Sequence, residues 1–147
     1  MVSLSRQVLL FLTLFAPHVH GDISARLSSE SIEELESVRL VIRAHNTRRA
    51  ESLDLADLEE NFHIMGNNTS SQYKYVNGRT QSWVDYQITL QPRKTGTLSI
   101  PPITVGNLST NPLTLDVRPL TPSTRRQIDE LVFYEQQFSS SSVYVQS

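Results

Sequence analysis

The feature that most constrains this chain is a two-residue repeat of apolar side chains between positions 23 and 117. Successive side chains of an extended chain point to opposite sides, so this repeat gathers the apolar residues on one face of each strand. The repeat is clearest at residues 38–44 and 84–90. It predicts an all-β fold in which one face of each strand is buried and the other meets water.

Turn signals divide the repeat into short strands. The pair Asn77-Gly78 accepts the positive φ angles of a type I′ turn, which predicts a hairpin between the run at 73–76 and the strand that reaches Gln91. Residues 92–96 predict a second turn, and Pro101-Pro102 interrupts the strand that follows. Residues 31–36 are interpreted as a turn, and the wider apolar spacing at 55–62 predicts one or two helical turns. Six or seven strands of this kind predict an immunoglobulin-like β-sandwich over residues 22–118.

The two ends of the chain differ from this central part. Residues 1–21 have the pattern of a signal peptide, with Arg6 before an apolar run at 8–16 and a cleavage point after Gly21. The run is too short to predict a membrane-spanning helix, and no later segment is long and apolar enough to be a transmembrane anchor. We therefore expect an exported, periplasmic protein that is released after signal-peptide cleavage.

The C-terminal part is expected to lie outside the sandwich. Residues 119–131 are interpreted as a linker, and residues 132–147 as the incomplete start of a second β domain. Segments 132–135 and 143–145 have strand character and are separated by a run of serines. This arrangement is consistent with a truncated gene product.

Composition excludes several classes of function. The 13 basic and 15 acidic residues give a net charge of −2, so there is no basic footprint for nucleic acid. The absence of cysteine removes disulfides, thiolate nucleophiles and cysteine-ligated zinc. Downstream of residue 21 the only histidines are His45 and His63, both expected on the solvent side of strands. We predict a protein that is not an enzyme and has no cofactor or metal.

Three aromatic residues are the candidate interaction residues. Trp83 falls on the polar face of its predicted strand, where an exposed aromatic side chain can anchor an interface. Tyr73 and Tyr75 lie on the preceding hairpin arm, and together the three could form a platform for a carbohydrate or another ligand. The simpler interpretation, which we favour, is that Trp83 packs under that arm, flanked by Tyr73 and Tyr75.

The order of several motifs resembles the first extracytoplasmic domain of the BatD family. The motifs stand at residues 77–79, 86–90, 92–106 and 110–115, and the resemblance covers residues 23–118. It implies an exported β-sandwich protein associated with oxygen tolerance (aerotolerance) and envelope stress. It also implies membrane partners that carry von Willebrand-type domains, and it transfers no catalytic residues. We therefore expect a non-catalytic interaction or scaffold module, with a carbohydrate- or ligand-binding sandwich as the alternative.

Overall fold

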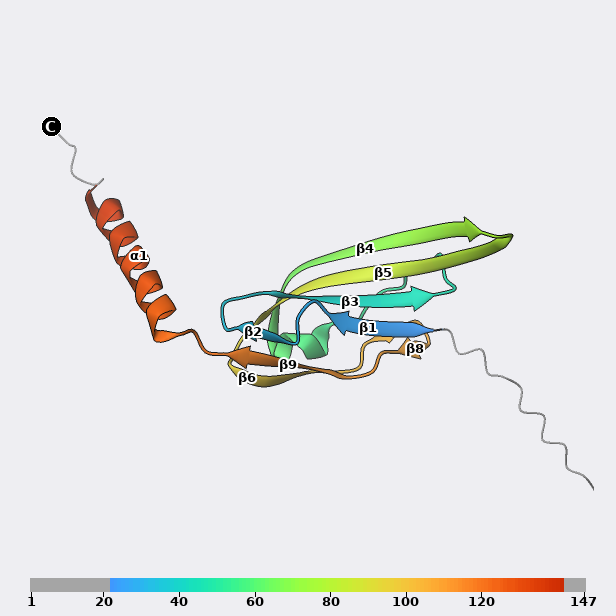
Figure 1. Ribbon diagram of the computed structural model, residues 1–147, viewed down its shortest axis with the longest axis horizontal. Coiled ribbons are helices and arrows are strands. Elements are labelled where there is room, and N and C mark those ends of the chain that lie inside the picture. The colour runs from blue at the N-terminus through green and yellow to red at the C-terminus, as the bar shows by residue number, and fades with distance from the viewer. Residues whose placement is uncertain (1–21, 142–147) are drawn as a thin grey trace, which may run out of the picture.

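The computed structural model describes residues 22–141 and shows strands stacked in two layers (Figure 1). One layer is a four-stranded sheet of order β1-β3-β5-β4, and the other contains a three-stranded sheet of order β2-β9-β6 and the small pair β7-β8. The first sheet comprises β1 (Ile23–Leu27), β3 (Val38–His45), β4 (Phe62–Val76) and β5 (Arg79–Pro92). The others comprise β2 (Ser31–Glu33), β6 (Gly96–Ile100), β7 (Thr104–Val105), β8 (Leu108–Ser109) and β9 (Leu113–Arg118). The predicted all-β sandwich is confirmed.

The core lies between the layers and follows the two-residue repeat. On β5 the side chains of Val84, Tyr86, Ile88 and Leu90 face the core, and each is no more than 1% exposed. Leucine and isoleucine side chains on β3, β6 and β9 belong to the same cluster. Each such side chain stabilises the fold by about 1.5–3 kcal/mol when fully buried. The repeat therefore identified the face of each strand that packs inward.

The hairpin of β4 and β5 forms as the Asn-Gly pair predicts. Asn77 and Gly78 both have positive φ, at 51° and 75°, and Val76 pairs directly with Arg79. The pairing of β5 with β3 ends where Trp83 meets His45, whereas its pairing with β4 continues to the turn. The distal part of the hairpin therefore has no β3 beside it and extends past the neighbouring strands (Figure 1).

Two short elements lie outside the alternating pattern. The 3₁₀ helix η1 (Ala56–Glu60) buries Leu58 against the core, which confirms the expected helical turn. The turn expected at residues 31–36 is partly wrong, because β2 occupies its first half and pairs in parallel with β9. Burial of Ile32 in the core and the ladder from Ser31 to Asp116 hold this three-residue strand in place.

The segment after the sandwich is helical, so the strand expected at residues 132–135 is wrong. The helix α1 (Pro122–Ser141) runs through those positions and through residues 122–131 of the expected linker. Its start has a local cause: proline is favoured in the first helical position, and the Thr121 hydroxyl accepts the N–H of Thr124 at 3.3 Å. An ion pair of 2.8 Å between Arg125 and Glu34 ties its first turn to the sandwich.

The chain enters the sandwich at one end and leaves it at the other. Strand β1 begins at the end where the hairpin projects, and β9 leads into α1 at the opposite end (Figure 1). The expected signal peptide and the strand expected at 143–145 lie outside the described residues, and the division into domains stays a prediction. None of the helices in residues 22–141 is long and apolar enough to span a membrane.

Candidate functional site

The outer face of the four-stranded sheet carries a cluster formed by Arg43, Trp83 and Asp85. Arg43 on β3 stands directly opposite Asp85 on β5. Its Nε and Nη2 donate to the two carboxylate oxygens, both at 2.7 Å. The same guanidinium lies over the Trp83 ring, 5.2 Å from the centroid. One arginine thus contacts both a buried carboxylate and an aromatic face. The two contacts together stabilise its position more than either contact alone.

The electrostatics of this cluster favour a fixed ion pair. The hydrogen bonds from Arg43 lower the pKa of Asp85 and outweigh the opposing effect of burial, and the bond to Asp85 raises the pKa of Arg43. The Trp83 indole N–H also favours the ionised carboxylate, although Nε1 is buried and makes no hydrogen bond of good geometry within the described residues. A carboxylate that is ionised and doubly engaged is poorly suited to transfer protons. The cluster therefore acts as a structural link between β3 and β5.

The register of the hairpin separates the three aromatic residues singled out in the sequence. Trp83 pairs with Gln72, whereas Tyr73 pairs with Ser82 and Tyr75 pairs with Thr80. Paired residues of antiparallel strands share a face, so the two tyrosines lie on one face and Trp83 on the other. The structure therefore does not bring the three together, and the tyrosines do not flank Trp83. The contact of Trp83 is with Arg43 instead.

The tyrosine face of the hairpin is open to solvent. The side chains of Tyr73 and Tyr75 are 59% and 66% exposed. The guanidinium of Arg48 lies over the Tyr73 ring, 4.8 Å from its centroid. A depression of about 300 Å³ between them is lined by Arg48, Ser71, Gln72 and Tyr73. Sequence reasoning missed Arg48, since nothing in its neighbourhood indicates that the loop after β3 folds back on β4.

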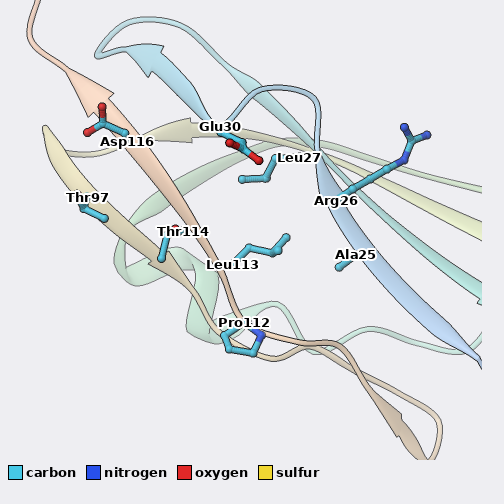
Figure 2. Close-up of a pocket in the computed structure, with 9 residues that line it drawn as sticks. All are labelled: Ala25, Arg26, Leu27, Glu30, Thr97, Pro112, Leu113, Thr114 and Asp116. Atoms are coloured by element: carbon cyan, nitrogen blue, oxygen red, sulfur yellow. The ribbon is translucent and has the colours of Figure 1, made fainter.

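A second cavity lies elsewhere, between β1 and strands β6 and β9 of the second sheet (Figure 2). It has a volume of about 590 Å³ and is lined by Ala25, Arg26, Leu27, Glu30, Thr97, Pro112, Leu113, Thr114 and Asp116. Leu27 and Leu113 lie at its centre, and Arg26 is directed away from them (Figure 2). Glu30 and Asp116 contribute carboxylates to the lining. The lining contains no histidine, lysine or cysteine. This mixed lining indicates no specific ligand.

The two histidines lie too far apart to act together. His45 pairs with Trp83 and His63 pairs with Gln91 on the same strand β5. Eight residues of strand separate these positions, which is about 26 Å. Within residues 22–141 no group of three or more metal-ligating side chains comes together. The arrangement of the histidines thus offers no metal centre and no paired acid and base in the described part of the chain.

Comparison with known proteins identifies the central domain. Residues 25–117, well over half of the chain, match the family described as BatD DUF11-like domain. The match begins within β1 and ends within β9, so it spans the sandwich and excludes α1. No curated protein and no solved structure gives a significant match to the chain. The extent of the family match over the sandwich shows that the chain belongs to the BatD family.

Proposed function

We propose that this chain is a non-catalytic protein-interaction module of the bacterial envelope. The observation that carries the proposal is the tyrosine face of the β4–β5 hairpin, where Tyr73 and Tyr75 are exposed on an arm that extends past the core. Large aromatic side chains in such positions are the typical anchors of protein interfaces. The sandwich would hold this arm rigidly and present it to a partner.

The chemistry of the described residues supports binding over catalysis. The most buried carboxylate, Asp85, is held by Arg43 on both oxygens, and the two histidines lie at opposite ends of the sheet. No histidine, lysine or cysteine lines the cavity of about 590 Å³. These are the features of a scaffold domain whose outer surfaces make contacts.

Membership of the BatD family supports a proposal about location and partners. We propose that residues 1–21 direct export to the periplasm, and that the partners are membrane proteins with von Willebrand-type domains. The association with oxygen tolerance and envelope stress would then reflect assembly of such a complex. A carbohydrate-binding role is not proposed, because the platform on which it depended is divided between two faces of the hairpin.

The test is co-purification of the full chain with a Bat-type membrane partner from cross-linked envelopes. We expect capture by the unmodified chain and loss of capture by the double variant Tyr73→Ala/Tyr75→Ala. Leu35→Ala is the matched control, because Leu35 is similarly exposed at 55% but lies in the β2–β3 connection. Equal capture by the tyrosine variant would remove the hairpin from the interface, and no capture by the unmodified chain would refute the proposed function.

A further inference from the structure

Strand β4 is an edge strand of unusual length. It spans Phe62–Val76, and β5 is its only neighbour in the sheet within the described residues. The edge strand on the other side of the same sheet, β1, has five residues. An edge strand presents a row of unpaired backbone N–H and C=O groups, which can pair with an added strand.

The turn determines which backbone groups face the free edge. In a two-residue hairpin the residues that flank the turn, here Val76 and Arg79, exchange both backbone hydrogen bonds. Hydrogen-bonded and non-hydrogen-bonded pairs then alternate along the ladder. The outward N–H and C=O groups therefore belong to Asn67, Thr69, Ser71, Tyr73 and Tyr75. The last two are the exposed tyrosines.

From Asn67 onward this edge has few of the features that usually protect an edge strand. Natural edges are blocked by proline, by several charged residues or by bulges. The irregularity in β4 lies between Ile64 and Gly66, before the outward positions begin. From Asn67 to Val76 the register is continuous, the sequence contains no proline, and Lys74 is the only charged residue. The distal two thirds of β4 are therefore open to pairing.

The charge beside the edge indicates what would pair there. Residues 61–84 contain no aspartate or glutamate, whereas Lys74 and Arg79 lie on the hairpin. Arg48 lies over Tyr73 at the 300 Å³ depression, and within residues 22–141 it forms no ion pair. A carboxylate next to a guanidinium gains strong charge-assisted hydrogen bonds. Two copies of this edge would instead bring like charges together, so a partner of opposite charge is favoured.

We propose that the free edge of β4 binds an extended acidic segment of a partner protein, which adds to the four-stranded sheet as a further strand. Backbone groups of Ser71 and Tyr73 form the ladder with it, and an acidic side chain of the segment occupies the depression beside Arg48. Apolar side chains of the segment cover Tyr73 and Tyr75. The inference rests on the proposed function in that the partner is a protein.

The probe is a synthetic peptide of alternating glutamate and valine, titrated against the full chain by fluorescence polarisation. Ser71→Pro removes one outward N–H without removing a β4–β5 hydrogen bond, and Ser71→Ala is its matched control. We expect Ser71→Ala to bind as the unmodified chain does and Ser71→Pro to lose binding. Arg48→Glu should weaken binding about tenfold or more, because it removes a hydrogen bond to a charged group.

Several results would overturn the inference. Equal binding by Ser71→Pro and Ser71→Ala would exclude pairing at the edge, and equal binding of a lysine–valine peptide would exclude the acidic preference. A dimer of the unmodified chain that dissociates on Ser71→Pro substitution would identify a second copy as the occupant. Thr69→Pro, at the next outward position, serves if Ser71→Pro does not fold. Capture of the Bat-type partner unaffected by Ser71→Pro would refute this inference alone and leave the proposed function standing.

Discussion

The ion pair of Arg43 and Asp85 allows a sharp test of how strands β3 and β5 are joined. The side chain of Asp85 is 10% exposed and that of Arg43 is 38% exposed. Replacing Arg43 by methionine therefore leaves a nearly buried carboxylate without its partner. Replacing Asp85 by asparagine leaves a cation that still reaches water. The two single substitutions should differ in cost although they break the same pair.

The magnitudes follow from burial. Loss of one partner of a fully buried ion pair costs about 3–5 kcal/mol, and partial exposure reduces that figure. We expect Arg43→Met to lower the free energy of unfolding by about 3 kcal/mol and Asp85→Asn by about 1.5 kcal/mol. The double variant should be less destabilised than the sum of the two single variants, because it alone leaves no unpaired charge.

Equilibrium unfolding in urea measures these differences directly. Trp83 is the only tryptophan of the chain and lies in contact with Arg43, so its fluorescence reports the unfolding of this region. The variant Arg43→Lys serves as the control, since it keeps the charge but loses the two-point geometry. Equal costs for the two single variants, or a larger cost for Asp85→Asn, would refute the reasoning from burial.

Three further predictions concern stability and the hairpin. Folding lowers the pKa of Asp85 from its ordinary value of 3.8, so the ionised carboxylate stabilises the fold fully at pH values well above 3.8. This stabilisation is lost as the pH falls through the lower pKa of the folded state. Urea titrations at several pH values should show the loss in the unmodified chain and not in Asp85→Asn. Gly78→Ala should cost about 1–2 kcal/mol, because φ is +75° there, whereas Gly66→Ala, whose added Cβ meets no atom within 4 Å, should change the melting temperature little. Tyr86→Phe should lower the free energy of unfolding, measured by thermal melting, by about 1–2 kcal/mol. The buried Tyr86 hydroxyl accepts a hydrogen bond of 2.8 Å from the Glu51 N–H, and this bond is lost in the variant.

Much of the fold could be predicted because its determinants are local in sequence. The alternation of Val84, Tyr86 and Ile88 fixes which face of β5 is buried, and the Asn77-Gly78 pair fixes the register of the hairpin. The position of Trp83 on the polar face likewise follows from the alternation of side chains along one strand. The match of residues 25–117 to the BatD family agrees with these local signals.

The remainder depends on contacts between distant segments. The strand β2 exists because Ile32 reaches the core beside β9, a pairing that no local pattern encodes. The partner of Trp83 depends on the register between β3 and β5, and the contact of Arg48 with Tyr73 depends on the path of a loop. The β-branched and aromatic residues of α1 suggested a strand. The cap at Thr121 and the proline after it favour a helix instead.

The departure of β1 and β9 from opposite ends of the sandwich has a mechanical consequence (Figure 1). A pull applied between the two ends would run along the length of the strands, while the hydrogen bonds that join β1 to β3 lie across it. Those bonds would be loaded together in shear, so the first strand would resist being peeled away one bond at a time.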